Sequence, residues 1–332
     1  MPGPTLSAGL GLIHKQLTYH AKEPTSDFSG QTVIVTGGNA GLGRETCRYL
    51  ATLKVARLII ACRTVTKGEE ARQWILDQTK SQSVVEVWEL DMSDFQSVKA
   101  FSKRARSLDR LDAVLENAGS WPKQWEMVEG HETTVTVNVI STCLLAYLLL
   151  PRLRETAVTS NTTTRLSIVS SELHKFATLK ALDNPKIFEG LKKPTSDYDG
   201  RYNDTKLLEM IFVRKLAEAM SASPSGKGGI SINAMSPGWC NSNLKPGQTF
   251  GARMAERLLQ RSTEEGARLL VDAISLEKAE GRHGQYVSEA QVAKAAGWLY
   301  SGNGKEAEQR VWSELNSILE SIEHGCTNLG TG

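Results

Sequence analysis

The sequence predicts an α/β fold: a Rossmann-like doubly wound parallel sheet of about seven strands with helices on both faces. Short apolar runs alternate with longer amphipathic segments, which is typical of βαβ units. The apolar runs are nearly continuous, as expected for strands that helices cover on both sides. A glycine-rich turn separates the first apolar run from the first amphipathic segment.

The first predicted strand, Thr32–Thr36, is a β-branched run. The other predicted strands are 56–62, 84–90, 111–115, 164–169, 229–234 and a short one around 286–287. Predicted helices lie between them, at 41–53, 66–80, 95–108, 131–156 and 202–220. Two connections remain: 173–200, with little expected structure, and 221–229, which is typical of an exposed loop.

We expect one domain, residues 30–290, with an extension at each end. The C-terminal extension, 291–332, predicts one or two helices that pack on the domain. Its apolar residues at helical spacing indicate core contacts: Trp298, Val311, Trp312, Leu315, Ile318, Leu319 and Ile322. The N-terminal extension, 1–29, has an apolar patch at 6–13 followed by basic residues. A tail packed on the domain is favoured, and an amphipathic membrane-touching helix is the alternative.

Composition narrows the possible partners and the compartment. The net charge of +2 gives no electrostatic reason to expect nucleic acid. The 5 cysteines are scattered without a C-x-x-C pair, which favours a reducing, cytoplasmic location and no metal site. No segment reaches the roughly 18 apolar residues that a transmembrane helix needs.

The glycine-rich turn runs from Thr36 to Gly43, between a predicted strand and a predicted helix. Glycines allow a close backbone approach, and the N–H groups of a helix N-terminus attract a pyrophosphate. We therefore expect a dinucleotide here. The turn residues expected to contact it are Gly37, Asn39, Gly41, Leu42 and Gly43. A tight strand–helix turn without a ligand is the alternative.

Arg63 decides between the two nicotinamide cofactors. A carboxylate about 20 residues after the glycines normally binds the adenosine ribose of NAD. Arg63 stands at that place, after the second predicted strand. A guanidinium suits the 2′-phosphate of NADP through charge-assisted hydrogen bonds, so NADP is favoured. A solvated arginine at a strand end is the alternative.

Tyr202 and Lys206 are the candidate proton-transfer pair. They are four residues apart on a predicted helix, which places them on one face. A free phenol has a pKa near ~10, too high for easy proton exchange at neutral pH. The Lys206 ammonium would favour the phenolate and lower that pKa.

With these residues in place, the chain resembles the short-chain dehydrogenase/reductase family over about residues 30–290. Within it, Ala61–Arg63 with Lys67–Glu69, and Ser236–Trp239, are similar to the retinol-dehydrogenase-like branch. Both ends of the chain resemble fungal members, many of which serve secondary-metabolite pathways. The matching motifs, in the family's order, are Thr36–Gly43, Asp91, Asn117–Gly119, Asn138, Ser171, Tyr202 with Lys206, and Pro237–Gly238.

The resemblance implies the catalytic roles. Tyr202 is the general acid in reduction and the base in oxidation, and Lys206 also binds the nicotinamide ribose. Ser171 donates a hydrogen bond to the substrate oxygen, with Ser170 as the neighbouring alternative. Asn138 holds a water that links Lys206 to solvent; a core amide is the alternative.

The same resemblance implies further cofactor contacts. Asn117, Ala118 and Gly119 line the cofactor floor, and Asp91 contacts the adenine edge or instead caps the next helix. Pro237 and Gly238 face the nicotinamide amide. The family's usual threonine is Ser242 here, and Asn241 or Asn243 are alternatives for its role.

The segment Glu172–Gly200 is longer than in many family members and is expected to form a lid or wall of the substrate site. His174 is expected to cap this loop, with substrate contact as the alternative. Three tryptophans are candidates for lining an apolar pocket: Trp121, Trp125 and Trp239.

These residues together predict an NADP(H)-dependent oxidoreductase that interconverts a ketone and a secondary alcohol on an apolar small molecule. One alternative keeps the fold and cofactor for redox-neutral epimerisation, dehydration or cyclisation. Another is a non-catalytic scaffold. The resemblance implies a homodimer through the long helices, with a C-terminal extension that covers this face as the alternative.

Overall fold

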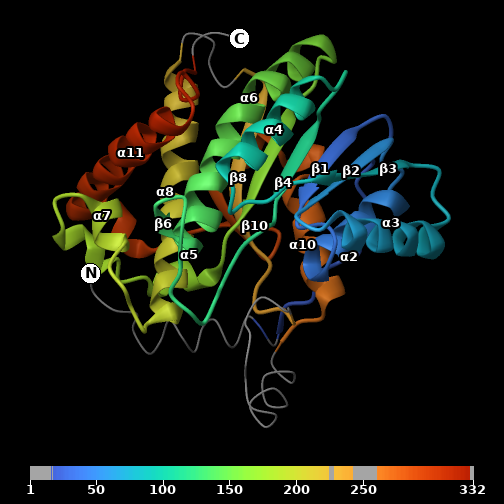
Figure 1. The fold of residues 1–332 in the computed structure, drawn as a ribbon. Helices are drawn as coiled ribbons and strands as arrows, with labels where there is room; N and C mark the ends of the chain where they lie inside the picture. The colour runs from blue at the N-terminus through green and yellow to red at the C-terminus, as the bar shows by residue number, and fades with distance from the viewer. Residues whose placement is uncertain (1–15, 17, 224–227, 242–259, 330–332) are drawn as a thin grey trace.

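The computed structural model describes residues 16, 18–223, 228–241 and 260–329. These residues form an eight-stranded sheet in the order β10-β9-β8-β7-β4-β1-β2-β3 (Figure 1). Every neighbouring pair is parallel except β10, which runs antiparallel to β9. The strands are β1 (Thr32–Thr36), β2 (Arg57–Cys62), β3 (Val84–Glu89), β4 (Ala113–Glu116), β7 (Thr164–Val169), β8 (Ile230–Ser236), β9 (Gln285–Ser288) and β10 (Gln291–Ala293).

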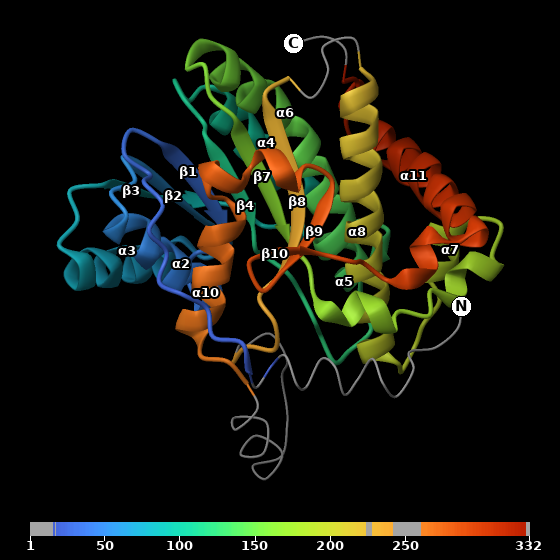
Figure 2. The same cartoon turned by 180° about the vertical axis from the view of Figure 1, so that it is seen from behind.

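Helices cover both faces of the sheet, which confirms the predicted architecture (Figures 1 and 2). One face carries α4 (Phe95–Arg106), α6 (Thr142–Thr159) and α8 (Tyr198–Ala222). The other carries α2 (Gly41–Thr52), α3 (Val65–Thr79) and α10 (Thr263–Ala273). The remaining α-helices are α5 (Thr133–Val135), α7 (Ile187–Leu191) and α11 (Gly302–Ile322).

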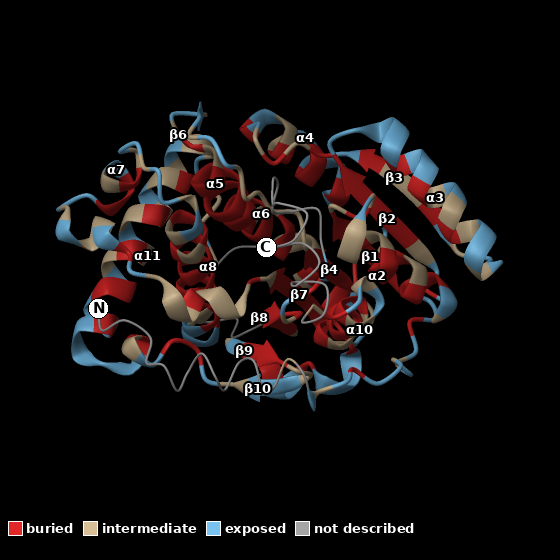
Figure 3. Cartoon of the chain, turned by 90° about the horizontal axis from the view of Figure 1, so that it is seen from below, coloured by how far each residue is buried: buried red, intermediate tan, exposed pale blue. Residues whose placement is uncertain are grey.

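The core lies between the sheet and these helices, so the central strands are buried throughout (Figure 3). This burial explains their continuous apolar sequence. Outside the main sheet, β5 (Met127–Val128) and β6 (His131–Glu132) form a small antiparallel pair.

The sheet has one strand more than the expected seven. β10 is a three-residue edge strand, largely exposed, and is too short to show a periodic pattern. It begins at Gln291, so the sheet extends just past residue 290. The predicted strand at 286–287 is confirmed as β9.

The prediction that 173–200 holds little structure is wrong. The segment contains two 3₁₀-helices, Glu172–Phe176 and Lys180–Asp183, and then α7. Helix α8 also begins at Tyr198, four residues earlier than expected, because Asp197 accepts a hydrogen bond from the Gly200 N–H at 2.9 Å. Single helical turns carry no 3.6-residue repeat, so sequence periodicity cannot reveal them.

The helix expected at 131–156 contains an irregular segment. A π-helical stretch, Thr136–Ser141, connects α5 to α6. The helical run Thr133–Thr159 is long and apolar enough to cross a bilayer, yet 89% of its most apolar window is buried inside the fold. This burial is typical of the core helix of a globular protein.

The C-terminal helix α11 lies along the outer side of α8 (Figures 1 and 2). Three of its residues, Val311, Leu315 and Leu319, are fully buried, as the helical spacing predicts. The aromatic rings of Tyr147, Phe212 and Trp312 form a cluster between α6, α8 and α11.

Candidate active site

The candidate site lies at the carboxyl ends of the central strands. β1 and β4 are neighbours in the sheet, although β2 and β3 separate them in sequence. The strand order reverses at this point, and open α/β sheets bind ligands in the crevice that results. The glycine-rich turn follows β1, and Asn117–Gly119 follow β4.

The glycine turn fits a dinucleotide. Gly37 and Gly41 have positive φ angles of 66° and 51°, which L side chains rarely adopt. A Cβ on Gly43 would lie 2.4 Å from the Gly37 carbonyl oxygen, so a side chain there cannot be accommodated. Ala40 precedes α2 and provides no side-chain cap. The N–H groups of the first turn of α2 therefore face the turn and suit a phosphate anion.

Thr36 links the segment after β4 to this turn through hydrogen bonds. Its hydroxyl accepts hydrogen bonds from the N–H groups of Asn117 and Ala118, both at 2.9 Å. The Asn117 amide donates back to the Thr36 carbonyl at 2.9 Å. A Cβ on Gly37 would lie 3.2 Å from Ala118 Cα, so the two expected cofactor segments are in close contact.

Arg63 is exposed at the carboxyl end of β2. Ala61, two residues earlier, pairs with Thr36 and accepts a hydrogen bond from the Gly37 N–H at 2.8 Å. Arg63 therefore shares the edge of the sheet that carries the glycine turn. A second cation, Arg44 in the first turn of α2, was missed by sequence reasoning; its guanidinium lies 4.2 Å from the Trp74 ring of α3.

Asp91 follows β3 at the same edge, and its carboxylate accepts hydrogen bonds from the Ser93 N–H and hydroxyl at 2.9 and 2.6 Å. The alternative that Asp91 caps the next helix is wrong. Asp94 is the N-cap of α4, through a 2.8 Å hydrogen bond from the Gln96 N–H.

Tyr202 lies in the second turn of α8 and is 5% exposed. Burial raises the pKa of its phenol, while Lys206 and a hydrogen bond with Ser171 oppose that shift. Lys206 lowers the pKa of Tyr202, as expected, but burial raises this pKa by a larger amount, so the net shift is upward. The phenol stays protonated at neutral pH and is suited to donate a proton.

Lys206 is 4% exposed, and its Nζ lies 5.5 Å from the centre of the Tyr202 ring. The ammonium donates to the Val169 carbonyl at 2.9 Å and to the Glu209 carboxylate at 2.7 Å. Burial alone would lower the pKa of Lys206. The interactions with Glu209 and Tyr202 raise this pKa by a larger amount, so the net shift is upward. Lys206 is therefore charged.

The two candidate serines point to different places. The Ser170 hydroxyl is buried and donates to the Lys206 carbonyl at 3.1 Å. Ser171 is partly exposed, accepts a hydrogen bond from the Leu173 N–H at 3.2 Å, and lies close enough to Tyr202 to lower the pKa of its phenol. This arrangement favours Ser171 over Ser170 as the group that meets a substrate oxygen.

Asn138 is fully buried in the π-helical stretch. Its amide accepts from the Ser120 N–H at 2.7 Å and donates to the Ser120 carbonyl at 3.0 Å and the Thr205 hydroxyl at 3.1 Å. The side chain thus links the segment after β4 to α8, between Tyr202 and Lys206. Short π-helical segments within α-helices, such as the one that carries Asn138, are frequent at functional sites.

His174 is a loop-capping residue, as expected. It is 1% exposed; its Nδ1 lies 2.6 Å from the Ser171 carbonyl oxygen, and its Nε2 accepts from the Ala296 N–H at 3.1 Å. Because Nε2 is an acceptor, the ring proton is on Nδ1 and is donated to Ser171. Burial lowers the pKa of His174 to about 4. The neutral ring thereby fixes the backbone of Ser171.

Trp121 covers one face of Tyr202. Its ring stacks on Tyr202, with centroids 4.0 Å apart and planes 5° from parallel, and its indole N–H donates to Asp199 at 3.1 Å. The sequence suggested a pocket-lining role for Trp121 but not this stack, because contacts between distant segments leave no local pattern. Trp125 is partly buried and Trp239 is 43% exposed.

Pro237 and Gly238 follow β8 at the same edge of the sheet. Gly238 has a φ of 79°, and a Cβ there would meet the Arg261 guanidinium. The side chain of Gln16 bonds to both the N–H and the carbonyl of Trp239, at 3.1 and 2.7 Å. The N-terminal extension thus contacts this turn. Ser242, Asn243 and the patch at 6–13 lie outside the described residues.

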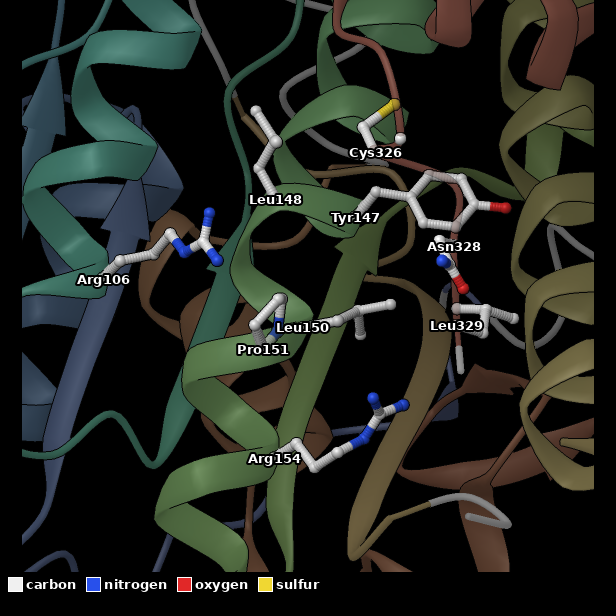
Figure 4. A pocket seen from close by; sticks show the side chains of 10 residues that line it. Arg106, Tyr147, Leu148, Leu150, Pro151, Arg154, Cys326, Asn328 and Leu329 are labelled. Atoms are coloured by element: carbon white, nitrogen blue, oxygen red, sulfur yellow. The ribbon is translucent and has the colours of Figure 1, made fainter. Parts of the chain in front are cut away.

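A pocket of about 140 Å³ lies elsewhere, between α6 and the C-terminal segment (Figure 4). None of the proposed catalytic residues lines it. Its lining residues are Arg106, Tyr147, Leu148, Leu150, Pro151, Arg154, Gly325, Cys326, Asn328 and Leu329.

Comparison with known proteins gives consistent matches. A family profile described as short chain dehydrogenase matches residues 31–172. The chain is 37% identical to a short chain dehydrogenase/reductase from Cryptosporiopsis sp., over 96% of this chain and 99% of the relative. It is 36% identical to a short-chain dehydrogenase from Penicillium roqueforti, over 96% of this chain and 85% of the relative.

Solved structures share the fold at low identity. The Pseudomonas aeruginosa RhlG/NADP active-site complex has a TM-score of 0.61 at 19% identity, over 80% of this chain and 97% of the other. A short-chain dehydrogenase from Sphingobium yanoikuyae in complex with NADPH has a TM-score of 0.55 at 19% identity, over 86% and 95%.

Proposed function

Because this chain belongs to the short-chain dehydrogenase family, we propose that it is an NADP(H)-dependent oxidoreductase that reduces a ketone on an apolar small molecule to a secondary alcohol. Its relatives favour a place in fungal secondary-metabolite biosynthesis. The 5 unpaired cysteines, 4 of them buried, suit a cytoplasmic location.

One observation carries the proposal: Ser171, Tyr202 and Lys206 lie together at the edge of the sheet where the glycine turn begins. Bound NADPH would supply the hydride. The Tyr202 phenol would protonate the carbonyl oxygen, and the Ser171 hydroxyl would donate a hydrogen bond to the developing negative charge. Lys206 would hold the nicotinamide ribose and supply positive charge beside Tyr202.

Arg63 and Arg44 are the proposed contacts of the 2′-phosphate. Arg63 lies directly before the N-cap of α3, and Arg44 stacks on Trp74 of the same helix. The two guanidiniums, with an arginine rather than a carboxylate at position 63, favour NADP over NAD. Asp91 and Asn117–Gly119 would line the adenine and ribose sites, with Pro237 and Gly238 at the nicotinamide.

Fluorescence titration with NADPH and NADH tests the cofactor choice. Arg63→Asp should weaken NADPH binding by about tenfold or more, because it replaces a charge-assisted hydrogen bond with repulsion. Lys103→Asp, in the last turn of α4 at the opposite end of the strands, should leave binding unchanged. Equal affinity for both cofactors in the wild-type protein would contradict the choice of NADP.

Turnover tests the reaction itself. In a screen of apolar ketones, the wild-type protein should consume NADPH, and Tyr202→Phe should abolish at least about 99% of the rate. Undiminished turnover in Tyr202→Phe would rule out the proposed proton donor. Product formation without NADPH consumption would instead indicate a redox-neutral reaction.

A further inference from the structure

Two carboxyl groups are buried close to the Tyr202–Lys206 pair: one is paired with Lys206, and the other interacts electrostatically with the first. Glu209 is one helical turn further along α8, and Glu116 is the last residue of β4. Each is 2% exposed. Carboxyl groups are rarely buried unless they are paired, so the position of both requires an explanation.

Glu209 has a partner. One carboxylate oxygen lies 2.7 Å from Lys206 Nζ, and both side chains are almost completely buried. A buried ammonium without an anion is strongly unfavourable and loses its proton instead. The contact with Glu209 therefore supports the charge that Lys206 needs beside Tyr202.

Glu116 has no such partner. Neither of its carboxyl oxygens has a hydrogen-bond partner among the described residues. Burial raises its pKa well above the usual range, and the charge on Glu209 raises it further. Burial also raises the pKa of Glu209, to about 7, although Lys206 and Ser170 oppose this shift. Two carboxylates in one dry site do not both ionise, so above that pH Glu209 is the anion and Glu116 the neutral acid.

The remaining titratable group at this site is on α6. The Cys143 thiol is fully buried, and its pKa is raised by burial and by Glu116 and Glu209. It is therefore neutral. Lys206 thus faces the phenol of Tyr202 and one anion, and the β4 and α6 groups beside that anion carry no charge.

We propose that Glu209 is a positioning residue of the active site: its carboxylate keeps the Lys206 ammonium charged and directed at Tyr202 and the cofactor ribose, with Glu116 beside it as a neutral acid. This inference rests on the proposed function, because Lys206 acts on the cofactor and on Tyr202.

The affinity for NADPH as a function of pH tests this inference without a known substrate. In the wild-type protein, NADPH affinity should be constant between about pH 8 and about pH 9.5, because Glu209 is then ionised and Lys206 stays charged. In Glu209→Gln the buried lysine lacks its anion. Its pKa should fall into this range, and NADPH affinity should then drop by about tenfold per pH unit until it equals that of Lys206→Met.

Two further variants separate charge from packing. Glu209→Asp keeps the anion and should retain the constant affinity. Glu308→Gln removes a buried carboxylate that pairs with Arg214 on α8 at 2.6 Å, away from the site, and should behave as the wild type does. Circular dichroism at each pH checks that every variant is folded.

The outcomes are distinct. A pH-independent affinity in Glu209→Gln, or the same pH-dependent loss in Glu209→Asp, would overturn the role of Glu209 and leave the proposed function intact. Wild-type protein that binds neither NADPH nor NADH would overturn the proposed function and, with it, this inference.

Discussion

At the scale of single residues, the proposed active site depends on which of its buried groups carry charge. Tyr202, Lys206 and Glu209 follow one another at spacings of four and three along α8, so one face of one helix presents the acid, the cation and the anion. Glu116 comes from the sheet and meets them only in the folded chain.

Glu116→Gln should stabilise the protein above about pH 5. In the unfolded chain Glu116 ionises near 4.5, whereas in the folded protein its pKa is raised well above that value. The unfolded state therefore gains stability from ionisation as pH rises, until the folded carboxyl also ionises. Glutamine keeps the shape of the neutral acid and removes this loss.

Thermal unfolding measures this effect. The melting temperature of Glu116→Gln should match that of the wild type near about pH 4 and exceed it by at least about 2 °C near about pH 7. A difference that is the same at both pH values would mean that Glu116 does not carry a raised pKa.

At the scale of elements, α11 organises the segment that sequence analysis left without structure. The Glu314 carboxylate accepts hydrogen bonds from the N–H groups of Ile187 and Phe188, at 2.7 and 2.8 Å, and so caps the five-residue helix α7. Arg310 donates to the carbonyl of Asn184, just before α7, at 2.8 Å. A helix this short has little intrinsic stability, so these contacts account for its formation.

Glu314→Ala should loosen α7 and the proposed wall of the substrate site. Loss of a cap costs about 1 kcal/mol, so amide hydrogen exchange of 187–191 should accelerate by about fivefold. NADPH affinity should not change. Glu306→Ala, at an exposed position of the same helix, is the control. Unchanged exchange in Glu314→Ala would show that α7 is stable without its cap.

At the scale of the whole molecule, α11 covers the outer side of α8. Trp312 packs against Phe212, with ring centroids 6.1 Å apart, and the Tyr147 hydroxyl on α6 donates to Asn316 at 3.0 Å. The family resemblance leads us to expect that relatives form dimers through their long helices, such as α6 and α8. Because α11 packs on this face, it limits the access of a second chain to it.

Removal of residues 302–332 should expose this face. We expect the truncated chain to self-associate more than the full chain and to melt at least about 5 °C lower, because several buried apolar side chains lose their partners. Light scattering coupled to size-exclusion chromatography and thermal unfolding measure both effects. A truncated chain with the same mass and melting temperature as the full chain would contradict this role of α11.

The sequence was sufficient to predict the elements of the fold that have a periodic apolar pattern. The buried strands and long helices have regular apolar patterns, and Tyr202 with Lys206 follows from helical spacing. The stack of Trp121 on Tyr202 and the electrostatic interaction between Glu116 and Glu209 join segments far apart in the chain, so no local pattern reveals them. The short turns of 172–191 form through tertiary contacts, and propensity alone does not predict them.

The cap that Glu314 places on α7 also affects how the proposed substrate wall could be exchanged between relatives to alter substrate preference. A chimaera that received only the 172–200 segment of another enzyme would present its α7 to a foreign C-terminal helix, without the matching carboxylate. The segment and α11 would have to be transplanted together, as one discontinuous cassette. In this protein, more than one hundred residues separate the two parts of that cassette.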